Sequence, residues 1–147
     1  MFTNILVPTD GSPLSRKATN AAAKLAKSMN AKVTSIHVTS PFRIVAVDFY
    51  MPPELLSSAE YDLATAKSAA KVLAHAEKVC KNAGVTWEGV HISSDEPYQS
   101  IIAAAKRRRC DLILMASHGR RGVAAVVLGS ETNKVLSHSK IPVLVYR

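Results

Sequence analysis

Two loops of this sequence carry residue types that could bind an anion. One follows the apolar run 112–115: residues 116–122 read ASHGRRG, and residues 129–132 read GSET at the expected start of a helix. Glycine lets a backbone approach a ligand closely, and the first N–H groups of a helix are unpaired and carry partial positive charge. Hydroxyl groups and arginines add hydrogen bonds and charge. This combination is the one expected for a polyphosphate site.

The other loop, residues 8–12, follows the apolar run 4–7 and reads PTDGS. Neither loop has the P-loop signature or the G-x-G-x-x-G spacing of dinucleotide-binding folds. Glycines in such loops often only make turns, and Asp10 could be no more than a turn or helix-capping residue. From the loops alone, an anion site and plain turns are both open.

Strand-like and helix-like segments alternate along the chain and would position these loops. Ser12 and Pro13 mark a helix start, and Gly84 marks a helix stop. The expected strands are 4–7, 33–38, 85–92, 112–115 and 142–145, and the expected helices are 13–29, 60–83, one from near Pro97 to near Arg109, and 130–137. Such alternation predicts a parallel sheet with helices on both faces. Ligands of these sheets bind beyond the carboxyl ends of the strands, where both loops lie.

Residues 39–58 interrupt the alternation. They show no helical period and include three prolines, and such a long irregular stretch is typical of a lid or a binding segment. In the helix that follows, apolar residues recur at helical spacing and predict its buried face. These residues are Leu63, Ala66, Ala70, Leu73 and Cys80.

Three segments together resemble the universal stress protein family. They are VPTDGS at residues 7–12, MASHGRRGVAAVVLGSETNKVL from residue 115, and the closing IPVLV from residue 141. The resemblance covers residues 1–147 as one nucleotide-binding domain. It implies a single-domain α/β three-layer sandwich of the adenine nucleotide alpha hydrolase-like type, with a five-stranded parallel sheet in the order 3-2-1-4-5 and four helices.

The ATP-binding pattern of that family is G-x2-G-x9-G-[S/T]. Here Gly119, Gly129 and Ser130 match it, and Ala116 stands where the first glycine is expected. If Ala116 needs a positive φ or packs against ribose or phosphate, its methyl group weakens binding; in an ordinary conformation the change is mild. The sequence leaves both outcomes open.

Carried over by position, the resemblance implies an adenine-nucleotide site. Pro8, Thr9 and Asp10 would lie against the adenosine, and the backbone of Val38 would meet the adenine edge. The ribose and phosphate side would be lined by Met115, Ala116, His118, Gly119 and Arg120, and the phosphates would be capped by Gly129, Ser130, Glu131 and Thr132. His118 could equally be bonded to backbone, and a carboxylate such as Glu131 repels phosphate unless a divalent metal or an arginine intervenes.

The chain contains no spacing typical of a catalytic set. The leading hypothesis is therefore a dimeric ATP- or AMP-binding stress-response module, with ATP bound with or without Mg²⁺ or Mn²⁺. The alternatives are a domain of the same kind that acts through protein contacts without nucleotide, at most a weak ATPase, and nucleic-acid binding through the basic last third. The homodimer would form through the apolar edge segment 142–146, bounded by Pro142 and Tyr146.

Composition sets further expectations. The net charge is +8, and its concentration in the last third favours an anionic partner. No helix suited to a DNA groove and no aromatic residues among the arginines 107–109 are seen, so sequence-specific nucleic-acid binding is not expected. Without a membrane-helix run, a signal-like start or a disulfide framework, we expect a cytoplasmic protein with Cys80 and Cys110 as packing residues.

Overall fold

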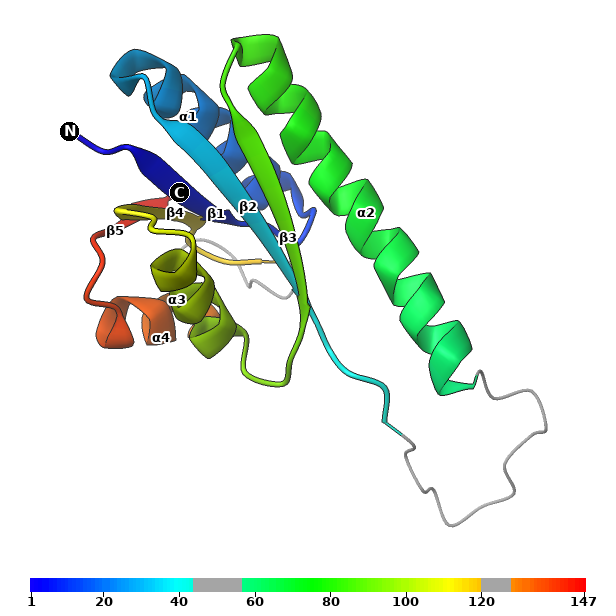
Figure 1. Cartoon of the computed structure of the whole chain (residues 1–147). Helices are drawn as coiled ribbons and strands as arrows, with labels where there is room; N and C mark the ends of the chain where they lie inside the picture. The colour runs from blue at the N-terminus through cyan, green and yellow to red at the C-terminus, as the bar shows by residue number, and fades with distance from the viewer. Residues whose placement is uncertain (44–56, 120–127) are drawn as a thin grey trace.

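The computed structural model describes residues 1–43, 57–119 and 128–147, and strands and helices alternate through them as expected. Within these ranges the elements follow one another in this order (Figure 1): β1 (Asn4–Pro8), α1 (Pro13–Met29), β2 (Lys32–Thr39), α2 (Ser58–Ala83), β3 (Trp87–Ser93), α3 (Pro97–Arg107), β4 (Leu112–Ala116), α4 (Ser130–His138) and β5 (Val143–Tyr146). Most of the irregular stretch expected between β2 and α2 lies outside the described residues.

The five strands form one parallel sheet in the order β3-β2-β1-β4-β5, which confirms the expected fold. All residues of β4 are buried, as are all of β1 except its last. A strand covered on both faces must be apolar throughout, and this explains the unbroken apolar runs of these two strands. The edge strands β3 and β5 are only partly buried.

Helices cover both faces of the sheet. Ile5 and Val7 of β1 point into a core shared with the small residues of α1. Leu6, between them in sequence, joins the opposite core with Ile101 of α3 and Val135 of α4. Successive side chains of a strand point to opposite faces, so one short strand contributes to both cores.

Two helix starts are capped as their sequences suggest. The Ser12 hydroxyl accepts a hydrogen bond from the N–H of Ser15 (3.2 Å), and Pro13 follows at the first helical position. At α2, Ser57 and Glu60 form a reciprocal capping box. These caps satisfy N–H groups that a helix cannot pair internally.

The buried face expected for α2 is wrong in its first half. The fully buried residues of α2 are Ala69, Ala76 and Cys80, whereas the side chain of Leu63 is 70% exposed. Figure 1 shows the reason: the first turns of α2 extend past the strands and have no sheet to pack against. Among the described residues, no helix is long and apolar enough to cross a membrane.

Both cysteines are packing residues, as expected. Cys80 and Cys110 are unpaired thiols in the two cores. Burial raises the pKa of Cys80 to about 11 and also raises the pKa of Cys110. Such thiols are protonated at neutral pH and unreactive.

One carboxylate joins the starts of β1 and β4. Asp111, just before β4, accepts hydrogen bonds from the N–H of Thr3 (2.8 Å), the N–H of Asn4 (3.0 Å) and the Thr3 hydroxyl (2.7 Å). Desolvation by itself would raise the pKa of Asp111, but these bonds favour the ionised form and lower it below 3.8.

We expect Asp111→Asn to lower the free energy of unfolding by about 1–2 kcal/mol at neutral pH, because the amide places a donor against N–H donors. A lowered carboxyl pKa stabilises the fold above 3.8, and this contribution is lost as the pH falls through the folded-state value. Urea denaturation should therefore show a difference between wild type and variant that shrinks in acid. Asp62→Asn, on the exposed side of α2, should change the free energy of unfolding little. An equal effect of both variants would contradict the stabilising role given to the Asp111 hydrogen bonds.

Candidate functional site

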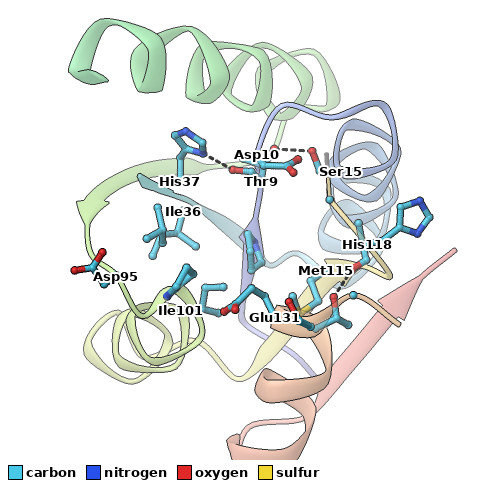
Figure 2. A pocket seen from close by; sticks show the side chains of 18 residues that line it. Thr9, Asp10, Ser15, Ile36, His37, Asp95, Ile101, Met115, His118 and Glu131 are labelled. Atoms are coloured by element: carbon cyan, nitrogen blue, oxygen red, sulfur yellow. Dashed lines mark hydrogen bonds between the residues drawn. The ribbon is translucent and has the colours of Figure 1, made fainter. Parts of the chain in front are cut away.

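A cavity of about 570 Å³ opens at the carboxyl ends of the central strands, between the loops that follow β1 and β4. It lies on the side of the sheet covered by α3 and α4, and Figure 2 shows its lining. The lining residues are Pro8, Thr9, Asp10, Ser15, Ile36, His37, Val38, Asp95, Pro97, Ile101, Met115, Ala116, His118, Gly119, Gly129, Ser130, Glu131 and Thr132. A volume of this size is typical of sites for small ligands.

The loop after β1 is held firmly against β2. The N–H of Thr9 donates to the carbonyl of Ile36 (2.9 Å), and His37 Nδ1 lies 2.7 Å from the carbonyl of Thr9. Because a carbonyl can only accept, this ring nitrogen of His37 carries the proton. Two bonds from neighbouring strand positions therefore fix one wall of the cavity.

Asp10 has both a turn role and a place in the cavity. Its Oδ1 accepts a hydrogen bond from the N–H of Ser12 (2.9 Å), so it shapes the turn that starts α1. Its Oδ2 lies so close to Gly119 that a Cβ atom added there would overlap it. The two loops thus touch through the Asp10 carboxylate, and glycine at 119 is what permits the contact.

Gly129 brings the start of α4 against the loop after β4. Its N–H donates to the carbonyl of Ser117 (2.7 Å), and a Cβ atom at 129 would lie 3.2 Å from that oxygen and from His118 Cα. Gly129 is also the N-cap residue, and glycine has no side chain with which to cap. The N–H groups at the start of α4 therefore face the cavity without the side-chain cap found at α1 and α2.

Ala116 has an ordinary strand conformation. Among the described residues, only Asn30 and Arg109 are non-glycine residues with positive φ, so the methyl group causes no backbone strain at the position where the family has glycine. The carbonyl of Ala116 accepts a hydrogen bond from the buried Thr132 hydroxyl (3.0 Å). The strand end and α4 are joined there.

Glu131 points its charge at helix α3. Its Oε2 accepts a hydrogen bond from the N–H of Tyr98 (2.9 Å), and its Oε1 lies 3.1 Å from Lys134 Nζ. A carboxylate is stabilised at the positive end of a helix, so Glu131 acts as the cap that the α3 sequence lacks. The Tyr98 N–H and the Lys134 ammonium compensate the negative charge of Glu131, which would otherwise repel a phosphate.

The site residues predicted from the sequence lie together around the cavity, except for one that the structure does not describe. Every predicted site residue that it describes lines the cavity, and Arg120 lies outside the described residues. His118 is on the rim: its ring points away from the cavity centre in Figure 2, and its Nδ1 lies 3.2 Å from the Ser117 hydroxyl.

Sequence reasoning missed part of the lining. Ile36 and Ile101 lie on the α3 side of the cavity (Figure 2) and belong to the same apolar cluster as Met115. The buried Ser15 closes the cavity near Thr9. Ile36 lies in β2 beside Pro8, the last residue of β1, and Ile101 lies in the first turns of α3. Their closeness to the carboxyl edge of the sheet is the signal that could have identified them.

Comparison with known proteins assigns the chain to a protein family. The model of the universal stress protein family matches residues 1–147. The chain belongs to this family. Universal stress protein YxiE of Bacillus subtilis is 31% identical over 151 residues, with all of both chains covered. The solved structure of UspA from Lactobacillus plantarum is 26% identical with a TM-score of 0.75, over 99% of this chain and 97% of that one. A universal stress protein solved in complex with cAMP is 26% identical with a TM-score of 0.71, over the same shares.

Acidic side chains in this family member's cavity are already engaged. Asp95 pairs with Arg43 (2.7 Å), and Asp10 and Glu131 make the contacts described above. Within residues 1–43, 57–119 and 128–147, no group of three His, Cys, Asp or Glu side chains could hold a metal ion.

If Glu131 caps α3, Glu131→Ala should lower the free energy of unfolding by about 1 kcal/mol, because the Tyr98 N–H loses a charged acceptor. Lys134→Ala removes the exposed ion pair and an exposed contact of Lys134 Nζ with the Tyr98 ring (5.5 Å to its centroid), and should have the smaller effect. Denaturant titration of both variants makes the comparison. Equal losses from the two substitutions would mean that the ion pair, not the cap, matters.

Proposed function

We propose that the cavity binds an adenine nucleotide and that the protein acts as a nucleotide-binding stress-response module. The observation that carries the proposal is the start of α4: N–H groups without a side-chain cap face a cavity whose opposite wall is the Thr9–Asp10 loop. A helix start of this kind attracts phosphate through its N–H groups and dipole. The relative solved with cAMP supports the same ligand class.

The two ends of the cavity suit the two ends of a nucleotide. Ile36, Ile101 and Met115 offer an apolar wall for the flat base, which loses contact with water there. Gly129 and Ser130 lie at the helix start, where phosphate oxygens can accept from N–H and hydroxyl groups. Asp10 lines the same cavity beside Gly119, and its carboxylate suits the ribose hydroxyls. The ligand we propose is ATP or AMP, with or without Mg²⁺ or Mn²⁺.

Three substitutions test this arrangement by calorimetric titration with ATP and with AMP. Gly129→Val places a side chain against the Ser117 carbonyl and should abolish binding. Asp10→Ala should weaken binding about tenfold through loss of a charged acceptor. Ala116→Gly should bind as well as wild type or better, because Ala116 carries no strain that glycine would relieve and glycine restores the family pattern.

Controls separate binding from folding. Thermal melts of each variant report whether the fold is intact, and Asp10→Asn keeps the acceptor that shapes the turn while removing the charge. Wild-type binding by a folded Gly129→Val variant would place the site elsewhere. If the wild type binds neither nucleotide, the family fold serves protein contacts alone; phosphate release above a catalyst-free control would instead indicate a weak ATPase.

We also propose that the protein is a homodimer joined at β5. This strand ends the sheet, and Leu144 leaves 40% of its surface exposed there. An apolar edge strand is an association site unless it is covered, and a second copy covers it by two-fold symmetry.

Light scattering at tens of micromolar protein should therefore give a dimer mass. Leu144→Lys should shift the mass toward the monomer, because it buries a charge in the interface. Leu63→Lys, on the exposed part of α2, is the matched control and should remain dimeric. A monomer mass for the wild type, with and without nucleotide, would refute the dimer and leave the binding site untouched.

A further inference from the structure

The end of the molecule opposite the cavity is strongly basic. The helices end and the strands begin at this end (Figure 1). We call it the basic end; its exposed cations are Lys27, Lys32, Lys81, Lys106, Arg107, Arg108, Arg109 and Lys140, and its acids are Glu88 and Asp111.

The acids of the basic end are engaged with neighbours. Glu88 pairs with Arg108, and Asp111 accepts the hydrogen bonds from Thr3 and Asn4 described above. In the part of the chain that the structure describes, Lys106, Arg107 and Arg109 make no ion pair. Their charge faces solvent uncompensated.

The cations of the basic end lie close enough to act together. The N–H of Lys32 donates to the carbonyl of Thr3 (3.0 Å), while the N–H of Thr3 donates to Asp111 (2.8 Å). Strands lie about 4.8 Å apart in a sheet, so Lys32 and the turn that carries Arg109 are about 10 Å apart across β1. A duplex carries a phosphate about every 3.4 Å of axis on each strand, so cations spread over this distance can contact several phosphates at once.

Arg109 stands in a conformation that an arginine adopts at a cost. Three helices end with a left-handed residue: Asn30 after α1 (φ 55°), Gly84 after α2 (φ 70°) and Arg109 after α3 (φ 55°). Asparagine and glycine are the usual residues there, and other side chains are disfavoured. The helix dipole explains cations inside the last turns, such as Lys27, but it does not favour arginine over glycine at 109. A strained residue of this kind points to a role other than folding.

We infer that the basic end binds the phosphate backbone of a nucleic-acid duplex without regard to sequence. Its cations lie at helix ends and turns, so no helix is presented to a groove. The aromatic residues Phe2 and Trp87 of this end are both partly buried and pack against the core, and the Trp87 indole N–H is bonded to the Ser35 hydroxyl (3.0 Å), so neither offers a stacking platform. A membrane surface would instead call for an amphipathic helix with large apolar residues beside the cations. The basic end is separate from the cavity, so this inference does not depend on whether the cavity binds a nucleotide.

Fluorescence anisotropy of a labelled DNA duplex and of a scrambled duplex tests the inference. Both should bind alike, and affinity should fall steeply between about 50 and 200 mM salt, because bound counterions are released. Arg107→Gln and Arg109→Gly should each weaken binding several-fold and reduce the salt slope by about one. The control is the double variant Lys67→Gln/Lys71→Gln, which lies in α2 away from the basic end. It removes the same charge as the two arginine substitutions together and should bind like wild type.

Stability distinguishes lost contact from lost fold. Arg109→Gly should raise Tm by about 2–4 °C while it weakens duplex binding, because glycine relieves the left-handed conformation. Three results would overturn the inference: no duplex binding by wild type at low salt, unchanged binding by Arg109→Gly, or an equal loss in the Lys67→Gln/Lys71→Gln control. Binding to vesicles with about a quarter phosphatidylglycerol, without binding to the duplex, would also overturn it in favour of a lipid surface.

Discussion

The reversal of strand order at β1 is the constraint on which the site depends. The chain leaves β1 toward α1 on one face of the sheet, and it reaches and leaves β4 through α3 and α4 on the other. The loops beyond these neighbouring strands must therefore diverge, and a cavity opens between them. The burial of both strands, with their unbroken apolar runs, keeps this geometry fixed.

Close backbone contacts then set the shape of the cavity. Gly129 brings α4 within hydrogen-bond distance of the Ser117 carbonyl, and Gly119 leaves room for Asp10. The same packing explains why Glu131, beside the proposed phosphate site, does not oppose it: the carboxylate is directed to the start of α3. Charge at both ends of the molecule follows the helix direction, with helix starts at the cavity and cationic helix ends opposite.

The alternation of apolar patterns predicted the strand and helix order along the chain, while the resemblance to universal stress proteins implied the sheet order and most of the cavity lining. It did not decide the conformation of Ala116, since a strand end and a left-handed turn can carry the same residue. It misplaced the buried face of α2, because Leu63 has helical spacing but lies beyond the end of the sheet. The apolar wall at Ile36 and Ile101 was missed since contacts between separate elements do not show in local patterns. The glycine pattern and the resemblance to universal stress proteins supplied the ligand class.

The most direct test of the account is a ¹H–¹⁵N NMR titration of the protein with AMP. If the nucleotide binds between β1 and β4, the amide signals of Asp10, Gly119, Gly129 and Ser130 shift together with a single binding curve, while those of Lys32 and Arg109 at the basic end stay in place. Shifts confined to the basic end would show that only phosphate charge is recognised, and they would contradict a nucleotide site between β1 and β4. Unchanged spectra at saturating nucleotide would contradict it equally.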